Sequence, residues 1–317
     1  MASVDVLMPF RDAEPWICRA WQSLRRQELR DWRLVAVDDG SRDRGAEALR
    51  RAARDDPRLL LIRAPARGVA AALNRGLAEV RAPVVVRMDA DDLSLPSRLG
   101  RLLRALEENP GWHGAASRVR LFPPGRVTPA MARYVAWQNG LVSPGAIARE
   151  RYVECTATHA TLAVRTEVLV GMGGWWEGPG PEDLDLLLRW HRLGLTLGKV
   201  PEVLYLWRER AGRETRTSPR MSREAFLAVK ARHLAAELAL RGQTEVRVFG
   251  RGRSLGAWVG ALARRGVRAE AVEWRAGSGR PRWSGLALFC FGAPGVRARV
   301  RRELGGHAEG TDYLFVS

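Results

Sequence analysis

Hydrophobic and polar residues follow two periods along the N-terminal part of the chain. Short apolar runs of a length typical of buried strands lie at 4–8, 33–37, 59–62 and 84–88, and the first is expected to stop at Pro9. Apolar residues at helical spacing fill the segments between them, at about 15–29, at about 43–54 and from about residue 68. This alternation predicts right-handed βαβ units and a mainly parallel sheet flanked by helices.

A second alternation of this kind occupies the C-terminal part of the chain. A helix is expected over about 222–241, because Ser222 precedes apolar residues at helical spacing and Gly242 follows them. Strands expected at 246–250, 269–274, 286–291 and 313–316 predict a small βαβ module that resembles half of a Rossmann-like domain. We therefore expect a main domain at 1–218, a linker helix at 219–243 and a small domain at 244–317.

Acidic residues follow the apolar run at 84–88 without a break. Asp89 and Asp91 alternate, so on an extended segment their carboxylates share one side, where together they can hold a divalent cation against a phosphate. Open α/β sheets bind their ligands at the carboxyl ends of the strands. The other interpretation is a strand followed by an acidic helix cap, since Pro96 fits a first turn, and we assign Asp92 to that helix start.

A second acidic strand end lies earlier in the chain, where the run at 33–37 leads into Asp38-Asp39-Gly40-Ser41. Alone, this segment is typical of a simple turn. Together with the later cluster it favours a functional site, because both acidic strand ends fall at the carboxyl ends of strands, where open α/β sheets bind their ligands.

The composition is strongly basic but does not concentrate the charge. The 317 residues carry a formal charge of +17, with a sequence pI near 11.2, and only Lys199 and Lys230 among the 52 basic residues are lysines. The arginines are spread along every expected helix, which indicates an ordinary solvated basic surface and no nucleic-acid partner. Contact with an anionic membrane surface, glycan or diphosphate is the second interpretation. A GC-rich bacterial coding bias or adaptation to heat would explain the choice of arginine.

Three cysteines lie far apart, at Cys18, Cys155 and Cys290, with no CxxC pair. This pattern suggests neither a disulfide framework nor a structural zinc site, and it fits a reducing compartment. No secretory leader and no apolar run long enough for a bilayer span are evident. We therefore expect a cytoplasmic protein, with membrane contact only at the periphery.

Several motifs in a fixed order give the chain its resemblance to a known family. The series is Pro9-Phe10-Arg11-Asp12, Val37-Asp38-Asp39-Gly40-Ser41, Arg67-Gly68-Val69, Asn74-Arg75-Gly76, Met88-Asp89-Ala90-Asp91-Asp92, Thr158-His159-Ala160-Thr161, Gly173-Gly174-Trp175 and Pro181-Glu182-Asp183-Leu184-Asp185. Over roughly residues 3–210 the chain resembles the family 2 glycosyltransferases, which have a GT-A fold. The resemblance implies an α/β fold of that type for the main domain.

The resemblance also implies a donor site for a nucleotide-diphosphate sugar, UDP-linked or similar. In it, the turn at Pro9 and Phe10 lines the base, Asp39 contacts the edge of the base, Asp89 lies near the ribose, and Asp91 with Asp89 ligates Mn²⁺ or Mg²⁺. The full set of expected donor-binding residues is Pro9, Phe10, Asp12, Asp38, Asp39, Arg67, Asn74, Asp89, Ala90, Asp91, His159 and Arg208.

For catalysis the resemblance assigns the general base to Asp183, with Glu182 as its neighbour. The implied reaction is inverting, metal-dependent transfer of a hexosyl-type group to a hydroxyl of a glycan or lipid-linked acceptor, in the synthesis of cell-surface or other glycans. The alternative is that Glu182 and Asp183 only cap a helix, although Asp185 on the same turn could do so.

Two positions leave the donor site open to more than one interpretation. His159, in an apparently strand-like run, is either a hydrogen-bonded structural residue or an acceptor-site or phosphate-side residue. Many relatives carry a histidine just after the position of Arg208, where this chain has Glu209 and Arg210. Positive charge for the diphosphate would then come from Arg208, Arg210 or Arg213, in a segment 208–220 that we expect to be mobile until the donor binds, as lids are.

The C-terminal module offers only a weak motif. Gly250, Gly252 and Gly256 follow an expected strand, but their spacing is one residue longer than the dinucleotide fingerprint, while Glu273 ends the next strand. A dinucleotide site and a docking or homodimerising module are both open. For the whole chain, a non-catalytic nucleotide-sugar-binding protein is the alternative to an enzyme.

Overall fold

The computed structural model describes residues 2–213 and 218–317. Contacts within the chain divide it into two compact units, each with its own sheet. The first unit comprises Met1–Pro144, Ala157–Gly178 and Leu195–Arg213, and the second comprises Gly145–Thr156, Pro179–Gly194 and Glu214–Ser317. The second unit thus includes two segments from the middle of the chain. The domain boundary expected at residue 218 stays a prediction.

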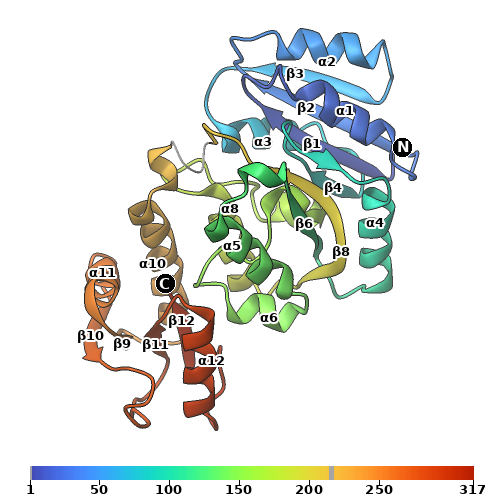
Figure 1. Ribbon diagram of the computed structural model, residues 1–317. Helices are drawn as coiled ribbons and strands as arrows, with labels where there is room; N and C mark the ends of the chain where they lie inside the picture. Colours follow the sequence, from blue (N-terminus) through green and yellow to red (C-terminus); the bar gives the residue numbers. More distant parts are fainter. Residues whose placement is uncertain (1, 214–217) are drawn as a thin grey trace. The chain divides into compact units, whose positions relative to one another are not determined.

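The first unit is built on an eight-stranded sheet in the order β3-β2-β1-β4-β7-β6-β8-β5 (Figure 1). One half of it is parallel and consists of β3 (Leu59–Ala64), β2 (Trp32–Asp39), β1 (Val4–Phe10) and β4 (Val84–Arg87). In the other half, β7 (Ala163–Arg165) is antiparallel to β4 and to β6 (Gly114–Phe122), β8 (Leu197–Arg208) is parallel to β6, and β5 (Leu93–Ser94) is antiparallel to β8. The mixed, mainly parallel sheet expected from the sequence is confirmed.

The first strand runs through Pro9, so the expectation that it stops there is wrong. Pro9 lies in register with Val37 of β2, and Phe10 lies in register with Asp38. On its other side β1 pairs with β4 only from Val4 to Leu7. Proline is tolerated at this point because the ladder with β4 has already ended, so no hydrogen bond of that ladder is lost.

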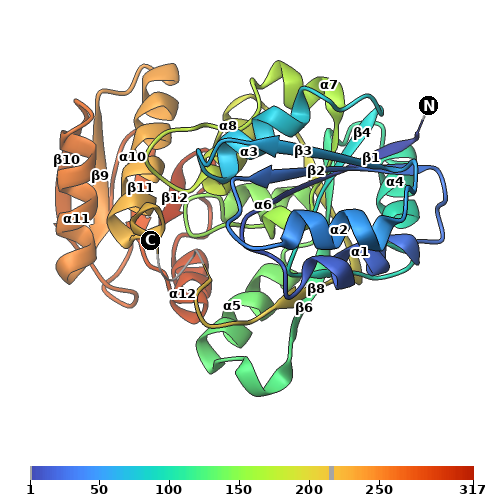
Figure 2. The same ribbon diagram turned by 90° about the horizontal axis from the view of Figure 1, so that it is seen from above.

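Helices cover both faces of the parallel half. The helices α1 (Ile17–Arg25) and α2 (Gly45–Ala53) lie side by side on one face, and α3 (Val69–Leu77) lies on the other (Figure 2). A side chain at Gly76 would collide with Leu7, so this glycine lets α3 approach the sheet closely. The unit also contains α4 (Arg98–Glu108), α5 (Pro129–Gly140), α7 (Thr166–Gly171) and the 3-10 turns η1 (Pro124–Arg126) and η2 (His159–Thr161).

The second unit contains a four-stranded, fully parallel sheet in the order β10-β9-β11-β12. Its strands are β9 (Glu245–Gly250), β10 (Arg268–Glu273), β11 (Ala287–Cys290) and β12 (Tyr313–Val316), which confirms the small C-terminal parallel sheet. Gly250 permits close approach of β9 and β11, because a Cβ there would lie 2.9 Å from the Cβ of Cys290. The helices are α6 (Pro144–Arg149, from the boundary onward), α8 (Glu182–Arg192), α10 (Arg223–Leu240), α11 (Gly252–Ala263), α12 (Pro294–Glu303) and the turn η3 (Pro219–Met221).

Buried charged residues fasten the segment 145–156 to the C-terminal elements of the second unit. Glu150 binds Arg301 at 2.6 Å and Arg297 at 3.1 Å, and both arginines belong to α12. Lys230 of α10 donates to the carbonyl of Val153 at 2.8 Å. These contacts make α10 and α12 part of one packed unit with the middle segment. No helix within the described ranges is both long and apolar enough to cross a membrane.

Lys199 of β8 is a buried amine in the first unit. Its side chain is 2% exposed, and Nζ donates a hydrogen bond of 2.6 Å to the carbonyl of Gln138 near the C-terminal end of α5. Burial, followed by the charge of Arg118, lowers the pKa of Lys199 from 10.5 to about 7. The folded protein therefore binds this proton less tightly than the unfolded chain does.

We expect Lys199→Met to flatten part of the pH dependence of stability. Between pH 7 and 10.5 the unfolded chain keeps the Lys199 proton while the folded chain loses it, so this residue makes the free energy of unfolding rise with pH. The contribution is up to about 1.4 kcal/mol per pH unit. Urea unfolding of both proteins at pH 7, 8 and 9 measures it. Equal slopes in the variant and the parent would contradict the burial argument, whereas a constant offset reflects only the lost hydrogen bond.

Candidate active site

Three aspartates gather just beyond the end of β4. One carboxylate oxygen each from Asp89, Asp91 and Asp92 lies within 4.8 Å of the other two, with Asp89 and Asp91 half-buried and Asp92 buried. Because β4 neighbours β1, and β1 neighbours β2, the turns that follow these three parallel strands meet at one edge of the sheet. The sheet thus brings together the two acidic strand ends recognised in the sequence.

Asp92 belongs to this cluster, and its assignment to a helix start is wrong. It directly precedes β5, and the next helix, α4, begins only at Arg98. Oδ1 of Asp92 accepts a hydrogen bond from the backbone N–H of Arg208 at 2.7 Å, and the side chain of Tyr205 also interacts with this carboxylate. Oδ2 is buried and receives no hydrogen bond of ordinary geometry from the described residues. Burial, followed by the charges of Asp91 and Asp89, raises the pKa of Asp92 well above its ordinary value.

The cluster fits a hard divalent cation. Carboxylate oxygens are the ligands that Mg²⁺ and Mn²⁺ prefer, and three of them converge here. The buried Oδ2 of Asp92 receives no hydrogen bond of ordinary geometry from the described residues, so it can accept a cation. A cation held by Asp91 and Asp89 would offset the charges of these two aspartates, which together with burial raise the pKa of Asp92.

Arginines surround the acidic cluster. Arg87, the last residue of β4, has an almost fully buried side chain that forms an ion pair with Asp89. Nε of Arg210 lies 2.7 Å from Oδ2 of Asp91. Arg208, an expected donor-binding residue, donates from Nε to the backbone carbonyl of Asp91, and its guanidinium lies 4.3 Å from the centre of the Phe122 ring. Residues 214–217, within the segment expected to close over the donor, lie outside the described residues.

Asp38 and Asp39 are the last residues of β2, and both order loops at the same edge. The two carboxylate oxygens of Asp39 accept hydrogen bonds of 2.9 Å from the backbone N–H groups of Arg67 and Gly68, which places the start of α3. Asp38 accepts from the N–H of Ser41 at 2.8 Å, the contact that a simple turn predicts. Their role toward a base stays a prediction.

The turn after β1 is fastened to the turn after β2. Asp12, at a positive φ of 50°, accepts a hydrogen bond from the N–H of Arg42 at 2.7 Å, and its own N–H donates to Ser41 at 3.0 Å. Phe10, the last residue of β1, is buried in the core. Ala90, which lies between Asp89 and Asp91 in the sequence, is buried as well. Asp12 therefore holds two of the expected donor-binding turns in a fixed relation.

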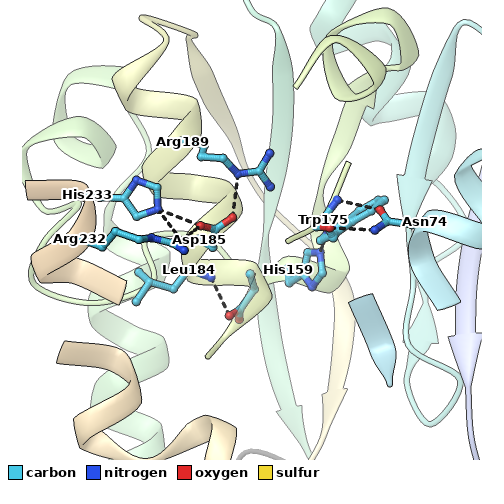
Figure 3. A network of polar contacts seen from close by, with 9 residues as sticks. Asn74, His159, Trp175, Leu184, Asp185, Arg189, Arg232 and His233 are labelled. Carbon is cyan, nitrogen blue, oxygen red and sulfur yellow. Dashed lines mark hydrogen bonds and ion pairs between the residues drawn. The ribbon is translucent and has the colours of Figure 1, made fainter. Parts of the chain in front are cut away.

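Asn74 and His159 both form hydrogen bonds with Trp175 (Figure 3). Asn74 of α3 bonds both the N–H and the carbonyl of Trp175, each at 2.8 Å, and donates to Glu177 at 3.0 Å. Glu177 also forms an ion pair of 2.9 Å with Arg67, whose side chain is largely exposed. The side chain of Asn74 thus fixes the segment 173–177, a structural contact that the sequence did not predict.

His159 lies in the 3-10 turn η2, so the strand expected around it is wrong. Backbone hydrogen bonds from Thr161 to Thr158 and from Leu162 to His159 close the turn. Nε1 of Trp175 donates to Nε2 of His159 at 2.7 Å, which requires Nε2 to be unprotonated. Burial, followed by the charge of Arg87, lowers the pKa of His159 well below its usual range. Its imidazole is therefore neutral, as the structural interpretation expects.

Glu182 and Asp183 form the first turn of α8, in the second unit. Oδ1 of Asp183 accepts a hydrogen bond from the N–H of Leu184 at 2.7 Å, and Oε2 of Glu182 lies 3.9 Å from Arg220. Asp183 thus caps one N–H of its helix, which does not prevent a second role. How these acids lie relative to the donor site of the first unit stays a prediction.

The third acid of this turn, Asp185, has a structural role that sequence reasoning missed. It is 1% exposed and binds Arg189 at 2.7 Å, His233 at 2.8 Å and Arg232 (Figure 3). Although burial raises the pKa of Asp185, the hydrogen bond with His233 and the charge of Arg189 lower it below the ordinary value overall. Asp185 therefore joins α8 to α10. The pair with Arg189 has the i,i+4 spacing of a helix and is visible in the sequence, whereas Arg232 and His233 lie far along the chain and no local pattern reveals them.

The fold of the chain is that of the GT-A glycosyltransferases. TarS of S. aureus in complex with UDP-GlcNAc superposes with a TM-score of 0.61 at 17% identity, over 84% of this chain and 82% of that chain. The mannosyltransferase PcManGT of Pyrobaculum calidifontis, in complex with GDP-Man and Mn²⁺, gives 0.53 at 22% identity, over 83% and 69%. At such identities these likenesses establish the fold.

Sequence comparison identifies the family. The model of glycosyl transferase family 2 matches residues 5–161, and this part of the chain belongs to that family. The putative glycosyltransferase EpsE of Bacillus subtilis is 26% identical over 211 residues, which is 65% of this chain and 73% of that protein. Against another curated relative the match spans only 31% of the relative's length.

We expect Asn74→Ala to destabilise the first unit by about 2 kcal/mol, because the buried N–H and carbonyl of Trp175 lose their partner. Asn109→Ala is the matched control, since Asn109 donates a single bond to the carbonyl of Ala105. Urea unfolding followed by circular dichroism measures both variants. A loss for Asn74→Ala no larger than for Asn109→Ala would contradict the role of Asn74.

Proposed function

We propose that the chain is an inverting, metal-dependent glycosyltransferase that moves a sugar from a nucleotide-diphosphate donor to a hydroxyl acceptor. The observation that carries this proposal is the three-aspartate cluster at the edge where β4, β1 and β2 end, within a domain of glycosyl transferase family 2. The GT-A proteins TarS and PcManGT, whose structures contain UDP-GlcNAc and GDP-Man with Mn²⁺, support the ligand class.

The donor would lie along this edge of the sheet. In the proposal, Pro9, Phe10 and Asp39 face the base, Asp89 binds the ribose, and Asp91 with Asp89 and Asp92 holds Mn²⁺ or Mg²⁺. A bound cation would act as a Lewis acid and neutralise the charge that develops on the departing diphosphate. Arg208 and Arg210 add positive charge beside Asp91. This charge would take the place of the histidine that the resemblance leads us to expect after Arg208.

Asp183 would act as the general base. It removes the proton of the acceptor hydroxyl while the hydroxyl oxygen attacks the anomeric carbon from the side opposite the diphosphate. A bond forms between oxygen and carbon, the bond from that carbon to the phosphate oxygen breaks, and the configuration inverts. The N-terminal end of α8 favours the ionised carboxylate that this step needs, and Glu182 is its neighbour.

The setting of the reaction also belongs to the proposal. We place the enzyme in the cytoplasm as a hexosyltransferase with a glycan or lipid-linked acceptor, and the wide spacing of the three cysteines, with no CxxC pair, supports a reducing compartment. The formal charge of +17 supports peripheral contact with an anionic membrane. Homodimerisation through the C-terminal sheet stays a prediction.

We expect Asp183→Asn to lower the transfer rate at least about 100-fold, because general-base catalysis contributes about 10²–10⁴. A thermal-shift screen of nucleotide sugars with and without Mn²⁺ first identifies the donor, and transfer is then followed by release of the nucleoside diphosphate. Binding of the donor, measured by calorimetry, should stay within about twofold, because the asparagine does not touch it. A variant as active as the parent would refute the assignment of Asp183.

Asp91→Ala should abolish the gain in donor affinity that Mn²⁺ provides, because the proposed cation loses its main ligand. Isothermal titration of the nucleoside diphosphate with and without Mn²⁺ measures this gain in the parent and the variant. Glu107→Ala, which removes an exposed acid of α4, is the charge-matched control. If the Mn²⁺-dependent gain survives in Asp91→Ala, the proposed metal site is wrong.

A further inference from the structure

Arg210 occupies the acidic cluster as a cation would. Its Nε lies 2.7 Å from Oδ2 of Asp91, and the guanidinium sits 4.5 Å from the centre of the Trp16 ring, at the start of α1. Its Nη1 donates to the carbonyl of Gly212 at 3.1 Å. The side chain of Arg210 is 27% exposed, so water screens its ion pair with Asp91 only in part.

The backbone directs Arg210 to this position. Arg208, at the end of β8, donates from its N–H to Asp92 and from Nε to the carbonyl of Asp91. The end of β8 is therefore bound to the acidic turn at two points, and Arg210 follows two residues later. The hydrogen bonds of Arg208 therefore hold the backbone that follows β8 beside the acidic turn, and this places Arg210 within reach of Asp91.

A divalent cation and the guanidinium of Arg210 compete for Asp91. Both carry positive charge, and repulsion between like charges a few ångströms apart is strong in a partly buried site. A nucleoside diphosphate changes this balance, because its oxygens offer Arg210 another anionic partner, to which guanidinium binds well. Arrival of the diphosphate would therefore release Asp91 for the cation.

Building on the proposed function, we propose that Arg210 is a resident cation that holds Asp91 until the donor binds, so that the divalent cation and the nucleoside diphosphate bind cooperatively. In the absence of nucleotide, the guanidinium keeps the affinity of Asp91 for Mn²⁺ low. In its presence, Arg210 passes to the diphosphate. Arg210 is a positioning residue for the donor and makes metal binding conditional on it.

The test is titration of Mn²⁺ into the full-length protein without nucleotide, by calorimetry and by the paramagnetic relaxation of water protons. We expect Arg210→Gln to bind Mn²⁺ about tenfold more tightly than the parent, because the competing charge is gone. Arg210→Lys, which keeps the charge, should bind it as weakly as the parent does. Arg104→Gln is the control, because it removes an exposed positive charge of α4 that pairs with none of the described residues.

A second titration of Mn²⁺ is carried out in the presence of UDP or of the nucleoside diphosphate that the donor screen identifies. In the parent, the nucleotide should raise the affinity for Mn²⁺, and in Arg210→Gln this coupling should fall about tenfold. Equal Mn²⁺ affinity in the parent and in Arg210→Gln, with nucleotide coupling intact and dependent on Asp91, would overturn the role of Arg210 alone. If the parent binds Mn²⁺ neither with nor without nucleotide, the proposed function fails as well. Circular dichroism melting confirms that each variant is folded.

Discussion

Mutual repulsion among Asp89, Asp91 and Asp92 is the constraint on which the first unit depends, because three carboxylates crowd the end of one strand. Positive charge from three arginines offsets this repulsion: Arg87 lies within the sheet, and Arg208 and Arg210 lie at the end of β8. The short pairing of β5 with β8 and the hydrogen bond from Arg208 to Asp92 follow from the same arrangement. The loops around the site are thus ordered by charge as much as by packing.

Much of this fold follows from the sequence because strand and helix periods differ. The runs that became β1 to β4 and the helices between them were all predicted, and so were the four strands of the C-terminal sheet. Pro9 misled the prediction, since its tolerance depends on where β4 stops pairing, which no local pattern records. The turn around His159 resembled a strand for a similar reason: the bond from Trp175 that fixes it comes from elsewhere in the chain.

The candidate site was predictable in its acids but not in their partners. Carboxylates after a buried strand are visible in a sequence, whereas Asp92 was misassigned because burial and an unpartnered oxygen appear only in three dimensions. On α8 the acids divide between two tasks, and Asp185 serves α10 through His233 and Arg232. Adjacent residues of one type can therefore carry different functions, and only long-range contacts separate them.

The choice of arginine at position 210 has a consequence for the conditions under which the site operates. A histidine, the residue that the family resemblance leads us to expect in this segment, exchanges its proton near neutral pH, so its charge varies with the acidity of the surroundings. A guanidinium keeps its charge throughout the range in which proteins stay folded. The positive charge that Arg210 places beside Asp91 therefore does not vary with the acidity of the surroundings.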